Sequence, residues 1–431
     1  MHHYLRRISR SMRSLNVIIV FFVVADLTAV ATAQAGSLTT LINFNGTNGS
    51  YPGSGLLDVN NKLYGTTSYA GSEGAGTLFS YDLSNGGLST LASFNGSNGS
   101  YPGSGLINVN NKLYGTTSYA GSGGTGTLFS YDLSNGSLNT LAGFNGSNGS
   151  YPWSDLIDVN NRLYGTAPSA GSGGTGTLFS FDLSNGGLST LASFNGSNGS
   201  YPGSGLINVN NKLYGTTSYA GSGGVGTLFS YDLSSGKLTT LVSFNGSNGT
   251  EPLGGLIAVN NRLYGTTSDT DGSDTGTLFS YDLSSGSLTT LVRFYGSQAN
   301  SGLLNVSNKL YGTTNIGGSG GVGTLFSYDL SSSSLSTLAS FNGSNGAEPL
   351  GGLIDVNNTL YGATSRGGSR GSGTVFAYQL PKSSTSVPEP GSMALLSTGL
   401  VGLGLMRRRR HPVVRSGASC RRCPSLPIAR A

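Results

Sequence analysis

The chain has 431 residues, of which only 10% are charged, whereas soluble globular domains have about 25% charged residues. Glycine occupies 71 positions, and the 36% of hydrophobic residues include 22 tyrosines. Disordered chains tend to be rich in charge and poor in aromatic residues, so this composition argues against a solvated disordered polymer.

The net charge of +5 is unevenly distributed along the chain. Residues 1–35 contain four Arg and one Asp, a net charge of +3, and residues 387–431 contain eight Arg and one Glu, a net charge of +7. Residues 36–386 contain 11 Lys or Arg and 16 Asp or Glu, a net charge of −5. Nucleic-acid binding needs clustered Lys and Arg on the folded domain, so no nucleic-acid partner is expected.

The central region, residues 36–386, contains no His, Cys or Met. This excludes a Ser-His or Cys-His nucleophile, a His-ligated zinc site and a disulfide framework from that region. Carboxylates, tyrosines and hydroxyl groups remain for chemistry, and no cofactor is expected other than the Ca²⁺ considered below.

The N-terminal segment, residues 1–35, has the three parts of a secretory signal peptide. Four arginines precede the apolar run 17–24, and small residues follow at Ala31, Ala33 and Ala35. Cleavage is expected after Ala33 or Ala35. The alternative is an N-terminal membrane anchor, for which the apolar run is shorter than the roughly 20 residues that a stable span needs.

The C-terminal part contains three features in order. A Ser- and Pro-rich linker at 381–390 ends in the box Val387, Pro388, Glu389 and Pro390; the apolar stretch 393–406 follows, and then the cluster Arg407, Arg408, Arg409 and Arg410. A helix of 14 residues reaches about 21 Å, less than the hydrocarbon core of about 30 Å. We expect a short membrane helix that inserts transiently, with the arginines on the cytoplasmic side.

This order resembles the PEP-CTERM sorting domain, here at residues 391–410 together with the box before it. The resemblance implies an exported bacterial protein whose partner is an exosortase-type membrane enzyme. Such a protein is tethered to the membrane before processing and then reaches the cell surface or extracellular matrix of a Gram-negative-type bacterium. The basic tail, residues 411–431, departs from the family pattern, and its pair Cys420 and Cys423 has C-x-x-C spacing, a weak signal when isolated.

The central region consists of seven copies of one unit. The word Leu-Tyr-Gly recurs in steps of 50, 50, 50, 50, 47 and 50 residues, beginning at Leu63, Leu113, Leu163, Leu213, Leu263, Leu310 and Leu360. Each unit predicts four short strands, which in the second unit are 105–109, 112–117, 126–133 and 138–144. The pair Asn110 and Asn111 between the first two strands suits a two-residue hairpin turn.

Four strands in about 50 residues, repeated seven times, predict an all-β, seven-bladed β-propeller with kelch-like spacing over residues 36–380. A parallel β-helix is the alternative. The region begins with a fourth-strand sequence at 38–44 and ends with a third strand at 373–380. The N-terminal strand can therefore complete the last blade and close the ring, which removes exposed sheet edges.

The unit also resembles the tandem repeat called GloVer, found in exported bacterial proteins with surface-sorting signals. The resemblance covers about 345 residues and rests on the recurring words Leu-Tyr-Gly-Thr-Thr and Gly-Thr-Leu-Phe. It implies the architecture and the destination of the protein but no established activity.

Because strands in a blade alternate in direction, the long loops emerge together on one face of the ring. That face is expected to gather tyrosines, namely Tyr51, Tyr69, Tyr101, Tyr119, Tyr151, Tyr201 and Tyr219. Aromatic rings stack on sugars, and amides and hydroxyls bind sugar hydroxyl groups, so we hypothesise a shallow polysaccharide-binding surface. Alternatively, the tyrosines brace the Gly-rich loops against one another.

Two loops differ from the consensus. In the third unit, Trp153 and Asp155 replace the usual glycines, which makes this loop the best single candidate subsite. In the fifth unit, Asp269, Asp271 and Asp274 surround a glycine, a pattern that suits Ca²⁺ coordination. A solvated acidic loop is the alternative.

The sequence favours a non-catalytic binding or structural role. Near-identical units distribute the same groups around a ring, whereas catalysis needs different groups at one place. The alternative is a polysaccharide hydrolase or lyase that uses the recurring carboxylates Asp58, Asp158 and Asp355. Equivalent positions hold Asn or Ala in the other units, which indicates drift at a surface turn.

Overall fold

The computed structural model describes residues 36–269 and 275–381. Outside the described residues lie the predicted signal peptide, the sorting box Val387–Pro390, the predicted membrane helix, the arginine cluster, the basic tail with its Cys pair, and Asp271 and Asp274. Within the described ranges, no helix is long and apolar enough to cross a membrane.

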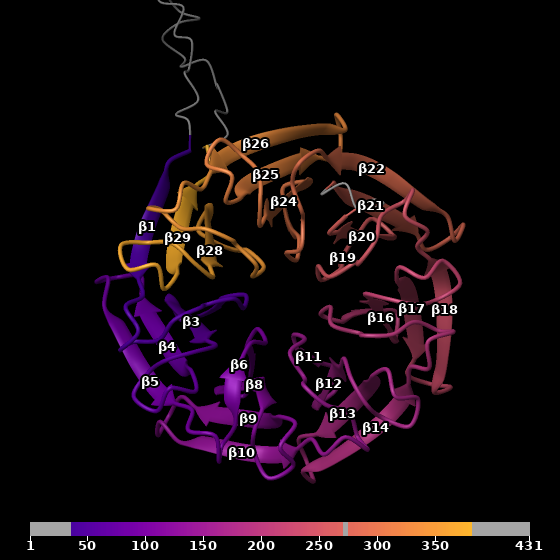
Figure 1. Ribbon diagram of the computed structural model, residues 1–431, viewed down its shortest axis with the longest axis horizontal. Helices are drawn as coiled ribbons and strands as arrows, with labels where there is room; N and C mark the ends of the chain where they lie inside the picture. Colours follow the sequence, from indigo (N-terminus) through magenta and orange to yellow (C-terminus); the bar gives the residue numbers. More distant parts are fainter. Residues whose placement is uncertain (1–35, 270–274, 382–431) are drawn as a thin grey trace, which may run out of the picture. The chain divides into compact units, whose positions relative to one another are not determined.

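Residues 36–269 and 275–381 form seven antiparallel sheets around a common axis, and no helix occurs among the residues described (Figure 1). Blade 1 contains β2 (Leu57–Val59), β3 (Lys62–Thr67), β4 (Thr77–Asp82) and β5 (Leu88–Ser93). Blade 2 contains β7 (Ile107–Val109), β8 (Lys112–Tyr119), β9 (Thr127–Asp132) and β10 (Leu138–Gly143), with β6 (Ser100–Pro102) beside β8. Blade 3 contains β11 (Ile157–Asp158), β12 (Arg162–Ala167), β13 (Thr177–Asp182) and β14 (Gly187–Ser193).

The remaining blades repeat this order. Blade 4 contains β15 (Ile207–Val209), β16 (Lys212–Thr217), β17 (Thr227–Asp232) and β18 (Lys237–Ser243). Blade 5 contains β19 (Ile257–Val259), β20 (Arg262–Thr267), β21 (Gly276–Asp282) and β22 (Leu288–Phe294). Blade 6 contains β23 (Leu304–Val306), β24 (Lys309–Thr314), β25 (Thr324–Asp329) and β26 (Ser334–Ser340). Blade 7 contains β27 (Ile354–Val356), β28 (Thr359–Thr364), β29 (Thr374–Gln379) and β1 (Leu38–Asn43).

A two-residue turn joins the first two strands of each blade. Asn60 and Asn61 have φ angles of 54° and 64°, as a type I′ turn requires, and asparagine tolerates this conformation better than most residues. The side chain of Asn61 also donates to Ser84 Oγ at 3.0 Å and ties the turn to the next one. The Asn-Asn hairpin prediction is therefore confirmed.

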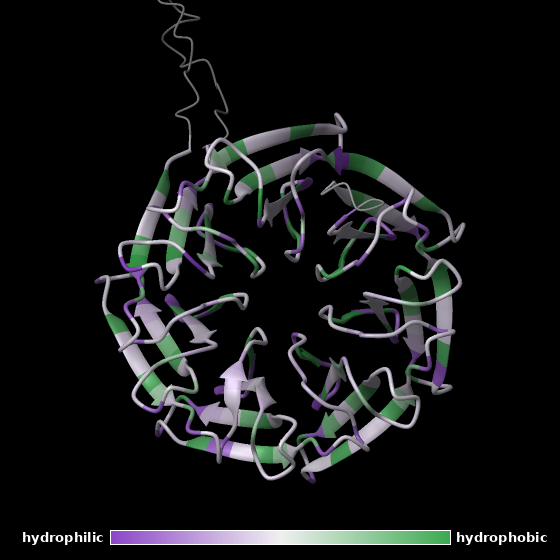
Figure 2. Ribbon diagram, viewed as in Figure 1, coloured by the Kyte–Doolittle hydropathy of each residue, from purple (hydrophilic) through white to green (hydrophobic). Residues whose placement is uncertain are grey.

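The hydrophobic core lies between blades, in seven clusters. At the interface of blades 7 and 1, Phe44 and Phe79 are fully buried, with ring centroids 5.1 Å apart and an angle of 65° between the ring planes. Equivalent Phe pairs recur around the ring, and Figure 2 shows hydrophobic positions on the strands of every blade. Each blade thus buries both faces against its neighbours, as its strand sequences predict.

The N-terminal strand closes the ring. β1 pairs antiparallel with β29, from Leu38 opposite Tyr378 to Asn43 opposite Thr374. The last sheet therefore combines the two ends of the repeat region, side by side in Figure 1. The seven-bladed propeller and its closure are confirmed, and the β-helix alternative is wrong.

Candidate functional site

Two kinds of long loop interlock on one face of the propeller. Connecting loops join the outer strand of one blade to the inner strand of the next, and blade loops join the second and third strands within a blade. In the connecting loop to blade 2, the Tyr101 N–H donates to the Ala75 carbonyl of blade 1 at 3.0 Å. The same loop pairs with blade 2, where Ser100 lies opposite Tyr119.

The tyrosines of the connecting loops have an uncommon backbone conformation. Tyr51, Tyr101, Tyr151 and Tyr201 have φ angles of 62°, 58°, 61° and 61°. Bulky residues adopt this left-handed region only where the surroundings fix them, and such residues cluster at functional sites. Hydrogen bonds to the loops on both sides supply that restraint, as the contacts of Tyr51 with Ser372 and Ser68 show.

The structure brings all seven predicted tyrosines together with Trp153. Neighbouring rings contact each other in edge-to-face or tilted arrangements, with centroids 4.7–5.6 Å apart, in two runs: Tyr51, Tyr69, Tyr101, Tyr119 and Tyr151, then Trp153, Tyr201 and Tyr219. We call these eight residues the aromatic arc. Its blade-loop members stay open to solvent, since Tyr69, Tyr119 and Tyr219 are 44%, 47% and 44% exposed.

At the positions equivalent to these tyrosines, blades 5 and 7 have the charged residues Glu251, Asp269, Glu348 and Arg366, whereas blade 6 has Gln298 and Ile316. Arg366 forms an ion pair with Glu348 at 3.1 Å, donates to the Tyr51 hydroxyl, and lies 5.3 Å from the centroid of the Tyr51 ring. Sequence reasoning missed this charged half, although aligning the seven units position by position would have revealed it.

The charged half also affects the aromatic half at the boundary between blades 4 and 5. Partial burial raises the pKa of Tyr219 above its ordinary value of 10.0, and the negative charge of Glu251 adds to this rise. The hydroxyl of Tyr219 therefore stays protonated at neutral pH and can donate a hydrogen bond.

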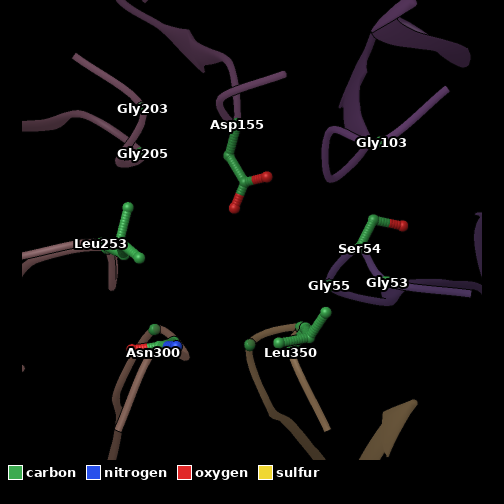
Figure 3. Close-up of a pocket in the computed structure, with 14 residues that line it drawn as sticks. Gly53, Ser54, Gly55, Gly103, Asp155, Gly203, Gly205, Leu253, Asn300 and Leu350 are labelled. Atoms are coloured by element: carbon green, nitrogen blue, oxygen red, sulfur yellow. The ribbon is translucent and has the colours of Figure 1, made fainter. Parts of the chain in front are cut away.

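A polar hollow of about 120 Å³ lies where the inner ends of the connecting loops meet (Figure 3). Glycines from six blades form most of its lining, and the side chains of Ser54, Asp155, Leu253, Asn300 and Leu350 complete it. Figure 3 shows the Asp155 carboxylate directed into the hollow. Among the residues that line it, Asp155 alone carries a formal charge.

Asp155 is held by a backbone group of the preceding blade. Its Oδ1 accepts a hydrogen bond from the Gly105 N–H at 2.5 Å. The side chain is open to water in the hollow, but atoms of the surrounding blades enclose it. This enclosure raises the pKa of Asp155 above its ordinary value of 3.8, and the bond from Gly105 opposes part of that rise.

Trp153 links the aromatic arc to the hollow. Its ring lies 5.3 Å from that of Tyr201, and Asp155 follows two residues later in the same connecting loop. The predicted pair thus lies at the point where both features meet.

The carboxylates of the predicted enzyme alternative do not gather at one place. Asp58, Asp158 and Asp355 lie on the inner strands of blades 1, 3 and 7. Burial is the main cause of the raised pKa of Tyr361 and of Tyr114. The negative charges of Asp58 and Asp355 add to the effect at Tyr361, whereas that of Asp158 adds to it at Tyr114. Asp158 is therefore separated from the other two.

The surroundings of Asp158 differ from the surface turn that the sequence indicated. Its Oδ1 is buried without a protein hydrogen-bond partner, as are the equivalent side-chain oxygens of Asn208 and Asn305.

The predicted calcium loop is described only in part. Asp269 Oδ1 accepts a hydrogen bond from the Thr275 N–H at 3.2 Å. Within the described ranges, no group of three or more His, Cys, Asp or Glu could hold a metal ion. Because Asp271 and Asp274 lie outside those ranges, Ca²⁺ binding stays a prediction.

Solved structures share the fold at low sequence identity. The extracellular domain of the hybrid two-component system BT4673 from B. thetaiotaomicron is 15% identical, with a TM-score of 0.56, over 79% of this chain and 39% of that one. An oligogalacturonate lyase in complex with manganese is 12% identical, with a TM-score of 0.54, over 81% of this chain and 94% of that one. The oligogalacturonate lyase of Vibrio parahaemolyticus is 10% identical, with a TM-score of 0.53, over 80% and 94%.

These likenesses show the fold alone, and the chain spans about two fifths of the length of the B. thetaiotaomicron protein. No curated protein matches the sequence. The PEP-CTERM protein-sorting motif matches residues 386–410, which indicates an exported protein that exosortase-type machinery sorts to the cell surface. The Gloeobacter/Verrucomicrobia repeat matches residues 28–229, 112–301 and 210–389, so the chain belongs to this repeat family.

Proposed function

We propose that this exported, surface-sorted protein binds extracellular polysaccharide along the aromatic arc and catalyses no reaction on it. The observation that carries the proposal is the row of half-open tyrosine rings, Tyr69, Tyr119 and Tyr219, on a face where connecting loops hold further aromatic side chains. Loops that served only as spacers would not need large aromatic groups at the surface.

The chemistry of the arc suits an extended chain of sugars. Aromatic rings offer apolar surface to sugar rings, and the tyrosine hydroxyls and loop amides can bind sugar hydroxyl groups. Each contact is weak, but several contacts to one polymer add through effective concentration. Trp153 and Asp155 would form the subsite beside the polar hollow that Asp155 lines.

Charge favours a neutral polymer. Glu251, Asp269 and Glu348 share the face with the arc, and the nearby cation Arg366 is already paired with Glu348. The central region also has a net charge of −5, which repels polyanions. An uncharged exopolysaccharide is therefore a better ligand than a polyuronate.

The sorting motif supports the place of action. In this proposal the C-terminal segment tethers the protein to the membrane until the exosortase-type enzyme processes it. The propeller then stays at the surface or in the matrix of a Gram-negative-type bacterium.

Two structural relatives are oligogalacturonate lyases, but at 12% and 10% identity they support the shared fold and no activity. Asp158 lies apart from Asp58 and Asp355, so the three carboxylates do not form one cluster. A non-catalytic role is therefore the one proposed.

The test is binding of the purified full chain to the exopolysaccharide of the producing cell and to a glycan array. The triple variant Tyr69→Ala, Tyr119→Ala, Tyr219→Ala and the single variant Trp153→Ala are compared with the wild type. We expect a loss of about tenfold or more in affinity for each, equivalent to about 1.4 kcal/mol.

Lys237→Ala, at the start of β18 and outside the long loops, is the matched control and should bind as the wild type does. Unchanged binding by both aromatic variants would leave bracing of the loops as the role of the tyrosines. Release of unsaturated or reducing sugar ends by the wild type would refute the non-catalytic assignment.

A further inference from the structure

The junction between blades 5 and 6 lacks a turn that the other junctions have. Between blades 7 and 1, residues 45–49 form the turn Asn-Gly-Thr-Asn-Gly after Phe44. After Phe294, by contrast, only Tyr295 and Gly296 precede Ser297. The chain is three residues shorter here, which accounts for the 47-residue step in the repeat.

Elsewhere, this turn covers two buried threonines. In blade 1, Thr67 and Thr77 share a hydrogen bond of 2.8 Å, and the Thr77 hydroxyl donates to the Asn48 carbonyl of the turn at 3.4 Å. The Gly71 N–H donates to the Gly46 carbonyl at 2.9 Å. Gly49 lies so close above Thr67 that a Cβ atom at this position would clash with its side chain.

Without the turn, a hollow of about 310 Å³ opens over blade 6. The equivalent threonines, Thr314 and Thr324, keep their 2.8 Å hydrogen bond and line the hollow. The Thr314 hydroxyl donates to the Ile316 carbonyl at 2.9 Å, so Thr324 can donate to Thr314 and keep its acceptor sites toward the hollow. Tyr295 is 82% exposed and belongs to the same lining.

The lining carries one formal charge, that of Arg293, whose guanidinium donates to the Ser247 carbonyl in the turn before blade 5. No carboxylate or lysine lines the hollow. The exposed apolar groups of the lining are Tyr295 and Leu335, above the buried rings of Phe294 and Phe326, and serine and threonine supply hydroxyl groups.

We propose that this hollow is a second binding site, which takes one ring of a neutral sugar. Tyr295 offers apolar surface to the sugar ring, and Thr324 and Ser297 can exchange hydrogen bonds with its hydroxyl groups. Gly318 lines the hollow and is equivalent to Gly71, whose N–H donates to the turn in blade 1. In blade 6, where this turn is missing, the Gly318 N–H donates to a sugar oxygen instead.

The residues of this site lie at the junction of blades 5 and 6, and none of them belongs to the aromatic arc. Each of the two binding proposals can therefore be refuted without affecting the other. Both sites together would let one propeller hold two segments of a polysaccharide at once. This would make the protein a cross-link in the matrix.

The test uses the purified full chain with glucose, galactose and mannose as probes. Methyl resonances of Thr324 and Leu335, both in the lining, report binding. We expect at least one neutral sugar to shift them with a dissociation constant on the order of millimolar, as suits so small a ligand.

Two variants locate the site. In the first, residues 295–297 are replaced by the six residues found at 245–250, which restores the missing turn and should abolish the shifts. In the second, Tyr295→Ala, affinity should fall about tenfold without loss of folding, because the side chain is exposed. Asn245→Ala, at the equivalent position of the preceding junction, and Tyr219→Ala on the arc should bind as the wild type does.

The proposal is overturned if none of the three neutral sugars shifts these methyl groups at concentrations on the order of 0.1 M, far above a millimolar constant. It is also overturned if the restored-turn variant, shown to be folded by its melting temperature, binds as well as the wild type. Either result would leave the aromatic arc untouched.

Discussion

The carboxylate of Asp155 in blade 3 accepts a hydrogen bond from the backbone N–H of Gly105 in blade 2, with 2.5 Å between the two atoms. The other six units have glycine at the position of Asp155. At one of these, Gly352, a Cβ atom would meet nothing within 4 Å. One unit in seven thus places a charged side chain in the polar hollow, where the other six have only the hydrogen atom of a glycine.

Asp155→Asn is expected to raise the melting temperature at pH 7. Enclosure raises the pKa of the native carboxyl above 3.8, so the native state holds its proton more tightly than the unfolded state. Asp155 therefore lowers the stability of the wild type as pH rises from 3.8 through the raised pKa. Asparagine removes the charge and keeps an oxygen that can accept from Gly105.

Thermal unfolding at a series of pH values checks this prediction. The advantage of the variant should be largest at neutral pH and should disappear below pH 3.8, where both side chains are uncharged. Water in the hollow screens the charge, so the shift should be small. A variant that melts below the wild type at pH 7 would show that the charged bond to Gly105 outweighs the enclosure.

Gly65→Ala is expected to destabilise the protein by about 1–3 kcal/mol, because a new methyl group must displace a packed side chain. A Cβ atom at Gly65 would lie 2.7 Å from the ring of Phe79, which is fully buried between blades 7 and 1. Chemical denaturation measures the change. Gly53→Ala is the control, since a Cβ atom there meets nothing, and its effect should stay within about 0.5 kcal/mol.

The sequence predicted the fold well because each unit repeats the same local signals. The Asn-Asn turns, the apolar third strand and the spacing of 50 residues each favoured a blade, and the fourth-strand sequence before the first unit predicted closure by β1. Seven repetitions made each signal difficult to mistake. Packing between blades then followed from strands that are apolar on both faces.

The candidate site was predictable only where the repeat stays constant. The tyrosines recur at fixed positions, so their common face followed from strand direction. The contacts of Arg366 with Tyr51 join residues 315 positions apart, and only the closed ring brings them together. The hollow at Tyr295 depends on space left by a missing turn, which spacing alone signals but does not describe.

Phe44→Ala and Phe144→Ala separate packing from ring closure. Both phenylalanines are fully buried, and each contacts a partner ring, at 5.1 Å for Phe79 and 5.0 Å for Phe179. Each variant should lose about 3–5 kcal/mol of unfolding free energy. Phe144 lies on a continuous stretch of chain, whereas Phe44 follows β1, which closes the ring.

Hydrogen exchange distinguishes the two variants. In Phe44→Ala, amides of β1 and β29 should exchange much faster than in the wild type, because a terminal strand can detach locally. In Phe144→Ala these two strands should keep their protection. Equal exchange of β1 in both variants would mean that the closure does not depend on the Phe44 contact.

Acid should destabilise the propeller through six equivalent aspartates at the ends of the third strands. The pKa of each lies below its ordinary value of 3.8; they are Asp82, Asp132, Asp182, Asp232, Asp282 and Asp329. The first cause is a backbone N–H of a serine in the following turn, except at Asp132, where the Ser134 hydroxyl comes first. A Lys or Arg partner, such as Lys212 at 3.5 Å from Asp232, adds to it.

A lowered native pKa stabilises the folded state above 3.8, and this contribution is lost as pH falls through 3.8 toward the lowered values. The melting temperature should therefore drop steeply below pH 3.8. Asp232→Asn should melt below the wild type at pH 7, with the difference shrinking in acid. Lys212→Ala should have a smaller effect, because the serine amides remain, and about 0.5 M salt should change little for the same reason. If Lys212→Ala lowered the melting temperature as much as Asp232→Asn, the ion pair and not the turn would be the main source of this stability.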